Sequence, residues 1–273
     1  MANEQTRRAM LTGMAAGIGV IGMVEQASAQ AQASGKTFVL VHGAWHGAWQ
    51  WRDIVPLLEA EGHRVLTPEL PGHGDDRAPI AEMTLERYAR RVQETIESAG
   101  EPVILVGHSM SGMVVTQAAE YAAPNISRVV YVTAFLPADG QALADLAASF
   151  EGADNVQPSL IVDEATGTCT LADDALVPLF YGECSDEDAA WACSKLRPEA
   201  LAAFVTPVQL TAEAYGSLPR AYIECVRDGA ITIELQRHMV AASPCNPVLT
   251  IDTDHSPFLS RTDELAAHLL SLA

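Results

Sequence analysis

Residues 103–112, Val-Ile-Leu-Val-Gly-His-Ser-Met-Ser-Gly, run from an apolar segment into a serine surrounded by small residues. The four apolar residues at its start are typical of a buried parallel strand, and residues 113–115, Met-Val-Val, continue beyond the turn. A serine at a sharp strand-to-helix turn exposes its hydroxyl close to the N-terminus of the next helix. Ser109 is therefore a candidate nucleophile, and it requires a base, an acid and an oxyanion hole from the rest of the chain.

Segments with strand character alternate with helical segments on both sides of this turn. Further strands are expected at residues 36–41, 64–67, 128–133, 221–225 and 247–251. Helices are expected at about 49–61, 84–98, 110–123 and 262–271. This alternation predicts an α/β fold with a mostly parallel, doubly wound sheet. Because chemistry gathers at the carboxyl ends of such strands, the residues that follow strands should meet at one edge: His42, Ser109, Asp228 and His255.

The segment from about 137 to 218 interrupts the alternation. It is rich in Ala, Asp and Glu, prolines recur along it, and residues 159–162 are its clearest strand signal. We expect it to form a helical cap, inserted after the strand at 128–133 and laid over the edge of the sheet.

The first 29 residues have the features of a targeting segment. Arg7 and Arg8 precede an uncharged stretch, 9–24, and Ala27-Ser28-Ala29 provides a small-x-small cleavage site. The uncharged stretch is short and glycine-rich for a membrane span. Paired arginines in this position resemble the twin-arginine export signal. We therefore expect 1–29 to be a signal peptide, 30–273 to be one domain, and the mature protein to be exported to the periplasm or secreted.

Composition limits the partners and cofactors. The chain has 16 Lys and Arg against 35 Asp and Glu, a net charge of −19, which argues against nucleic acid or an anionic membrane surface as a partner. Of the five cysteines, Cys184 and Cys193 could close a small disulfide loop, whereas Cys225 is expected to be a buried free thiol. The Cys and His spacings do not suit zinc, and no metal or cofactor is expected.

Three motifs in combination carry a family resemblance: His-Gly-Ala-Trp at 42–45, Gly-His-Ser-Met-Ser-Gly at 107–112 and Asp-His-Ser at 254–256. They resemble the α/β-hydrolase superfamily. The longer stretches 42–49 and 57–63 are similar to the branch that holds plant methylesterases, hydroxynitrile lyases and bacterial pyrethroid-type carboxylesterases. The resemblance covers 36–273, most weakly in the cap, and implies an α/β-hydrolase fold with serine esterase activity. Ser111 departs from the pattern G-x-S-x-G, which has glycine in that position.

The superfamily order of serine, acid and histidine assigns the remaining catalytic groups. His255 follows the last strand and is the candidate base, and Asp228 follows the strand before it and is the candidate acid. Asp139, after the strand that ends near residue 133, is the alternative acid. The resemblance also implies an oxyanion hole made of the backbone N–H groups of Ala44 and Met110.

Uncharged side chains are expected around this site: Trp45, Met110, Phe135, Leu136, Phe180 and Phe258. They predict a small to medium, neutral, hydrophobic ester as the small-molecule substrate, cleaved through an acyl-enzyme.

Two other functions can be weighed against ester hydrolysis. A cyanohydrin-cleaving lyase on this scaffold has a lysine after the catalytic histidine and a threonine in the first loop, where this chain has Ser256 and Gly43. The chain has only two lysines, Lys36 at the start of an expected strand and Lys195 in the cap, so no ammonium group is expected to be available to cyanide. A receptor would keep the pocket only to bind a ligand, and multiple turnover of an ester would exclude it. His42 and His46 could imitate a metal pair, but no carboxylate accompanies them in the sequence.

Overall fold

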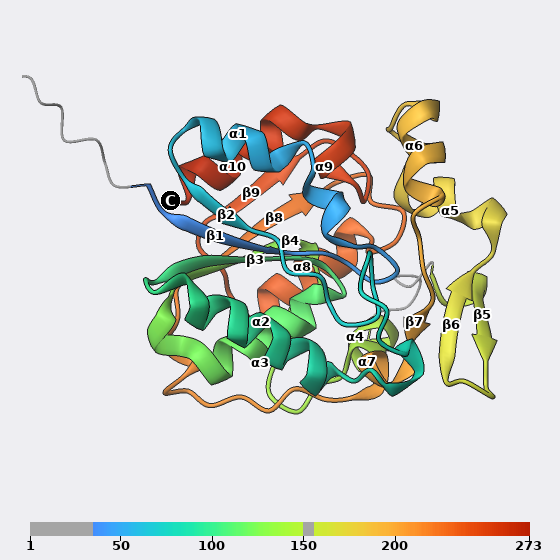
Figure 1. Cartoon of the computed structure of the whole chain (residues 1–273), viewed down its shortest axis with the longest axis horizontal. Coiled ribbons are helices and arrows are strands. Elements are labelled where there is room, and N and C mark those ends of the chain that lie inside the picture. Colours follow the sequence, from blue (N-terminus) through green and yellow to red (C-terminus); the bar gives the residue numbers. More distant parts are fainter. Residues whose placement is uncertain (1–34, 150–155) are drawn as a thin grey trace, which may run out of the picture. The chain divides into compact units, whose positions relative to one another are not determined.

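The computed structural model describes residues 35–149 and 156–273, so the predicted signal peptide at 1–29 lies outside the described residues. A six-stranded sheet with the order β2-β1-β3-β4-β8-β9 forms the centre of the fold (Figure 1). Its strands are β1 Thr37–Val41, β2 Arg64–Leu66, β3 Val103–Ser109, β4 Ile126–Ala134, β8 Arg220–Cys225 and β9 Val248–Ile251. All neighbouring strands of this sheet run parallel, which confirms the predicted parallel α/β fold.

Helices cover both faces of the sheet (Figure 1). On one face lie α2 Leu85–Ala99, α3 Ser111–Ala122 and α8 Ile233–Ala242. On the other lie α1 Ile54–Ala60, α9 Pro257–Ser260 and α10 Thr262–Ser271. Successive strand residues enter different cores: Val39 and Val41 pack with the first layer, and Phe38 and Leu40 with the second. Because both faces are buried, the strands have continuous apolar sequences rather than alternating ones.

The ends of two helices follow from local sequence. Thr84 accepts a hydrogen bond from the amide of Arg87 at the start of α2, and Gly100 ends the helix in the left-handed region at φ 75°. The helix expected at about 49–61 is divided instead into a short 3₁₀ turn, η1 Ala48–Trp51, and α1. Pro56 explains the division, because proline is tolerated in the first turn of an α-helix and not in its interior.

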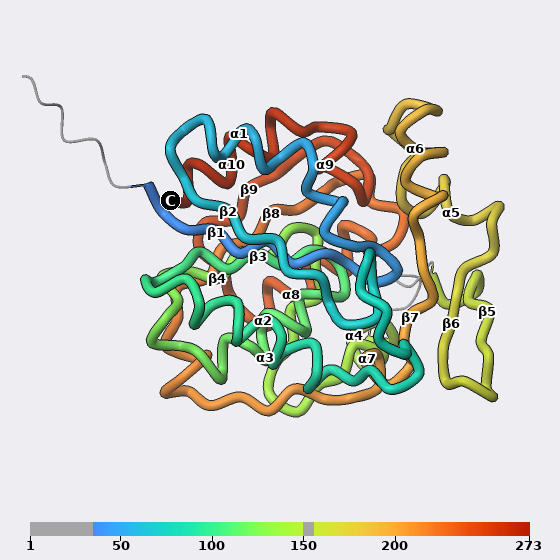
Figure 2. Tube along the Cα trace, viewed as in Figure 1, coloured from blue at the N-terminus to red at the C-terminus, as the bar shows by residue number. Residues whose placement is uncertain are grey.

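The cap is not wholly helical, and that part of the sequence-based expectation is wrong. Its helices are α4 Leu143–Ala148, α5 Asp173–Phe180, α6 Asp186–Cys193 and α7 Leu201–Val205. A three-stranded antiparallel sheet accompanies them, made of β5 Leu160–Asp163, β6 Thr168–Leu171 and β7 Glu199–Ala200 (Figure 2). A tight turn produces the hairpin: Asp163 accepts from the amides of Ala165 and Thr166, and Gly167 has φ 67°.

All five cysteines are free thiols, so the disulfide considered between Cys184 and Cys193 is not formed. The Cys184 thiol instead points to Asp254 Oδ2, 3.7 Å away, and Cys193 ends α6. Cys225 is a buried free thiol, as expected.

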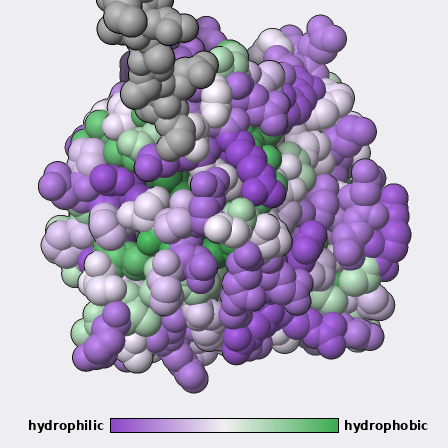
Figure 3. All heavy atoms as spheres, turned by 60° about the vertical axis from the view of Figure 1, so that its left-hand side comes forward, coloured by the Kyte–Doolittle hydropathy of each residue, from purple (hydrophilic) through white to green (hydrophobic). Residues whose placement is uncertain are grey.

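The face drawn in Figure 3 is mainly hydrophilic with scattered apolar areas. Among the described residues, no helix combines the length and apolar character needed to cross a membrane.

Gly112, in the first turn of α3, permits the helix to approach β4 closely. A Cβ atom at this position would lie 1.9 Å from the carbonyl oxygen of Phe135. We expect Gly112→Ala to lower the free energy of unfolding, measured by urea denaturation, by about 1–3 kcal/mol or more, because backbone atoms cannot turn aside as a side chain can. Gly182→Ala is the control, since its nearest neighbour would be Val177 O at 4.0 Å. Equal stability of the two variants would contradict this account.

Candidate active site

Ser109 lies at a strained turn between β3 and α3. Its φ of 56° is in the left-handed region, which is uncommon for a residue other than glycine and costs on the order of 1–3 kcal/mol. Ser111 supports the turn: its hydroxyl accepts from the amide of His108 and lies 2.9 Å from the Val41 carbonyl, to which it donates. Serine in the last position of the motif therefore ties the turn to β1. The first position requires glycine, because a Cβ at Gly107 would lie 2.7 Å from Val115 Cγ2.

His255 joins the serine to a carboxylate. Its Nε2 is 2.9 Å from Ser109 Oγ, and its Nδ1 is 2.7 Å from Asp228 Oδ2. A carboxylate can only accept here, so Nδ1 carries the proton and Nε2 is free to accept from the serine hydroxyl. The three side chains come from the ends of β3, β8 and β9, and all are buried. The geometry is that of a nucleophile, its base and the group that orients the base.

Asp228 is fixed by contacts that the sequence did not reveal. Oδ1 accepts from the amides of Ala230 (2.7 Å) and Ile231 (2.8 Å), and Oδ2 accepts from the hydroxyl of Thr133 as well as from His255. The carboxylate therefore has little freedom to rotate. Asp139, the alternative acid, is exposed and accepts from the amide of Leu210, so the structure does not bring it to His255.

The loop after β1 lies directly against the serine. A Cβ at Gly43 would be 3.1 Å from Ser109 Cβ, and the Gly43 amide donates to Gln50 Oε1 at 3.1 Å. Ala44 and Met110 line the same cavity as Ser109, and the Ala44 amide has no acceptor among the described residues. The next residue, Trp45, has φ 62°. Ala44 and Met110 therefore both border the space beside the Ser109 hydroxyl.

Three further histidines surround the site as neutral, hydrogen-bonded side chains. His46 donates from Nδ1 to the Ala44 carbonyl and accepts from Tyr181, and burial lowers its pKa to about 3. His42 donates to the Gly43 carbonyl and accepts from the Leu70 amide, and His108 donates to the carbonyl of His255. Burial likewise lowers the pKa of His42 and of His108 well below the ordinary value.

These contacts use both ring nitrogens of His42 and of His46, so the two are not a metal pair. In the part of the chain that the structure describes, no group of three potential metal ligands is found.

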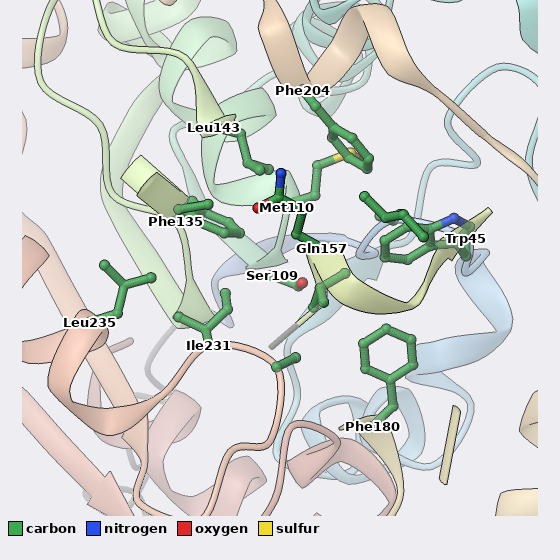
Figure 4. A pocket seen from close by; sticks show the side chains of 15 residues that line it. Trp45, Ser109, Met110, Phe135, Leu143, Gln157, Phe180, Phe204, Ile231 and Leu235 are labelled. Atoms are coloured by element: carbon green, nitrogen blue, oxygen red, sulfur yellow. The ribbon is translucent and has the colours of Figure 1, made fainter. Parts of the chain in front are cut away.

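A cavity opens above Ser109 (Figure 4). The aromatic rings of Trp45 and Phe180 lie on one side of the serine. The side chains of Phe135 and Ile231 lie on the other side. Its remaining lining residues are Ala44, Met110, Leu143, Ala147, Val156, Gln157, Leu160, Phe204, Ala230 and Leu235. Apart from Ser109 and Gln157, the described residues that line the cavity have apolar side chains.

Two of the six expected pocket residues do not line this cavity. Phe258 is fully buried below it, where its ring packs edge-on against His108 at a centroid distance of 5.1 Å. Leu136 is also buried, and its amide faces Met239 Sδ at 3.4 Å. Sequence reasoning missed Leu235 and Phe204. Leu235 and Met239 have the i, i+4 spacing of an apolar helix face, which could have revealed α8.

Comparison with known proteins agrees with this fold. Residues 38–268 match the Alpha/beta hydrolase family, and the chain belongs to it. It is 33% identical to Methylesterase 9 of Arabidopsis thaliana over 253 residues, covering 87% of this chain and 98% of that protein.

Two solved structures extend the likeness. Polyneuridine aldehyde esterase superposes with a TM-score of 0.79 at 29% identity, covering 87% of this chain and 99% of the other. A pyrethroid hydrolase from Sphingobium faniae JZ-2 also gives 0.79, at 26% identity, covering 86% and 96%. Relatives of these kinds identify the chain as a hydrolase of the esterase type.

The comparisons contradict the expected export. The curated relatives are plant proteins, mainly methylesterases, and three of them are named as chloroplastic. The localisation inferred from Arg7 and Arg8 is therefore wrong. The export signal was inferred from a short pattern, two arginines before an uncharged stretch. The likeness to the plant relatives extends over most of the chain and is the stronger observation.

The orientation of His255 gives a direct test of the acid. We expect Asp228→Asn to lower kcat about 10⁴-fold, because an amide in place of the carboxylate favours the wrong imidazole tautomer. Asp139→Asn is the matched control and should keep kcat within about twofold, since Asp139 contacts only the Leu210 amide among the described residues. Steady-state hydrolysis of a p-nitrophenyl ester measures both variants. A larger loss in Asp139→Asn would transfer the role to that residue.

Proposed function

We propose that this protein hydrolyses carboxylic esters, with Ser109 as nucleophile, His255 as general base and acid, and Asp228 as the carboxylate that orients the histidine. One observation carries the proposal: His255 lies between Ser109 Oγ and Asp228 Oδ2 at hydrogen-bond distance from each, on the floor of an apolar cavity. Membership of a family whose relatives here are methylesterases and other esterases supports the same reaction.

The reaction proceeds in two steps. Ser109 Oγ attacks the ester carbonyl carbon while its proton passes to Nε2 of His255. The ester C–O bond then breaks, and the departing alcohol oxygen takes that proton, leaving an acyl group on Ser109. Water next attacks the acyl carbon and gives a proton to His255, which returns it to Ser109 Oγ as the carboxylic acid leaves. Asp228 stabilises the imidazolium formed in each step.

The tetrahedral intermediate carries a negative oxygen in each step. We assign its stabilisation to the amides of Ala44 and Met110, which flank Ser109. Removal of a single donor of this type in other enzymes lowers kcat by about 10²–10³. The N-terminus of α3 (Ser111–Ala122) adds a favourable dipole at the same position.

The lining of the cavity favours a neutral, hydrophobic ester of small to medium size. A charged acyl or alcohol group would lose its hydration, and none of the described lining side chains carries a charge to compensate it. The net charge of −19 further disfavours anionic macromolecules as ligands. The proposed ligand is therefore a small-molecule ester.

A cyanohydrin lyase is disfavoured by the groups beside His255. Ser256, the next residue, is buried and uncharged, and both lysines of the chain, Lys36 and Lys195, are exposed. No ammonium group is therefore available to a cyanide ion at Ser109. A receptor that only binds would not need a histidine oriented between a serine and a carboxylate, as His255 is.

The nucleophile is tested by Ser109→Ala. The variant should fold normally and lose about 10⁴-fold or more in kcat, because Ser109 is the only hydroxyl among the described residues that contacts His255 Nε2. A fluorophosphonate probe should label the wild type at Ser109 and leave the variant unlabelled, as judged by peptide mass spectrometry. Activity above about a hundredth of the wild-type value would remove Ser109 from the mechanism.

The substrate class is tested with a panel of p-nitrophenyl esters. We expect kcat/KM to rise as the acyl chain is lengthened from acetate to hexanoate, since each buried CH₂ contributes about 0.8 kcal/mol. A p-nitrophenyl ester with a free carboxylate on its acyl chain, such as the succinate monoester, should be at least tenfold poorer than an uncharged ester of equal length. Equal rates for the charged and uncharged esters would contradict the assignment.

A further inference from the structure

Glu199 is a fully buried carboxylate that the reaction described above does not use. It belongs to β7 (Glu199–Ala200), the shortest strand of the cap sheet. A buried carboxylate is costly unless its oxygens are satisfied, so its partners indicate what it holds in place.

Three segments of the hydrolase domain converge on this carboxylate. Oε2 accepts from the amide of Trp45 at 3.3 Å and lies 2.9 Å from His73 Nε2. Oε1 accepts from the hydroxyl of Tyr88 at 2.7 Å and from the amide of Ala200 at 2.8 Å. The contact with His73 is an ion pair rather than an aligned hydrogen bond. Glu199 thus links the cap to the loops after β1 and β2 and to α2.

The surroundings keep the side chain ionised. Burial opposes ionisation, but the charge of His73 and the hydrogen bonds from Tyr88 and Ala200 hold the pKa of Glu199 below its ordinary value. Burial likewise opposes the charge on His73, yet Glu199, and to a lesser degree Glu69, raise its pKa. Each group therefore favours the charged form of the other, and an ionised carboxylate is a stronger acceptor for the Trp45 amide than a neutral group would be.

Trp45 is the residue that requires such support. Its φ of 62° is in the left-handed region, which a tryptophan adopts only when its surroundings impose it. The cap holds it at three points: Glu199 accepts from its amide, the Arg197 amide donates to its carbonyl at 2.9 Å, and its indole N–H donates to the Cys169 carbonyl at 3.2 Å.

The hydrogen bond to Glu199 fixes the peptide group that precedes the Cα atom of Trp45. Ala44 directly precedes Trp45, and the amide of Ala44 is one of the two proposed oxyanion donors. We propose that Glu199 is a positioning residue for ester hydrolysis: it fixes Trp45 in the left-handed conformation and so keeps the Ala44 amide directed at the oxygen that becomes negative. This inference rests on the proposed function. It makes the cap a structural part of the oxyanion hole as well as a wall of the substrate cavity.

The test compares variants that remove different parts of the cluster. Glu199→Ala removes the acceptor for Trp45, and Glu199→Gln keeps an acceptor oxygen but removes the charge. Tyr88→Phe is the matched control. Tyr88 donates to Oε1 of the same carboxylate, whereas the Trp45 amide donates to Oε2, so this variant leaves the contact with Trp45 in place. We expect kcat to fall about 100-fold in Glu199→Ala and about tenfold in Glu199→Gln, with KM within about threefold of wild type. Tyr88→Phe should keep kcat within about twofold.

A second measurement separates positioning from general damage to the fold. A trifluoromethyl ketone forms a tetrahedral oxyanion adduct with the serine, whereas an ether of the same shape occupies the cavity without reacting. The Kd for the ketone should weaken in each variant by the same factor as kcat falls, and the Kd for the ether should be unchanged. If Glu199→Ala does not fold, the kcat of Glu199→Gln and its Kd values for the ketone and the ether test the proposal by themselves.

The outcomes distinguish this inference from the function on which it rests. If both Glu199 variants lose no more activity per folded molecule than Tyr88→Phe, the carboxylate only anchors the cap and the inference fails, while ester hydrolysis stands. If kcat falls but the Kd for the ketone and for the ether weaken equally, the cavity rather than the oxyanion hole has changed, and the inference also fails. If the wild type neither turns over esters nor binds the ketone more tightly than the ether, the proposed function itself is wrong.

Discussion

The close approach of α3 to the end of β4 is the constraint on which the remainder of the site depends. Gly112 meets the backbone of Phe135 with no room for a methyl group, and this contact sets the direction in which α3 leaves β3. The turn between them is then short enough to hold Ser109 at φ 56°. With the serine fixed in this way, its hydroxyl can point only into the space that His255 shares with the apolar cavity.

Polar groups close to the serine are immobilised by hydrogen bonds rather than left to adapt. Asp228 has four donors, and His46, His42 and His108 each donate to a backbone carbonyl as neutral rings. Rigid dipoles of this kind need not reorganise when charge develops, and such preorganisation is a large part of enzymatic rate enhancement. The reacting groups thus lie in a rigid polar shell beneath an apolar cavity.

Sequence predicted the sheet well because strands buried on both faces leave long apolar runs, and glycine and threonine marked the ends of α2. It also placed Ser109, Asp228 and His255 at one sheet edge, because each follows a strand. The pocket was harder to predict. Phe258 and Phe180 are both aromatic, yet one lies in the core below His108 and the other faces the cavity, and this difference depends on tertiary packing.

The cap gave the weakest sequence signal. Its strands are two to four residues long, and only β5, which overlaps the strand signal at 159–162, was visible in the sequence. The partners of Glu199 are equally invisible, because Trp45, His73 and Tyr88 become its neighbours only when distant segments fold together. Pairings of this kind carry no local pattern that the sequence could show.

The hydrogen bond between Trp45 and Glu199 joins residues 154 positions apart. Contacts with such long sequence separation form late, because the intervening chain must first be ordered. The loop beside Ser109 therefore cannot take its final shape on a ribosome-bound chain that ends before residue 199, even though the serine and four strands of the central sheet, β1 to β4, have already been synthesised. The proposed active site is therefore completed only late in folding. In a nascent or partly folded chain, Ser109 lacks the neighbouring groups that would make it reactive.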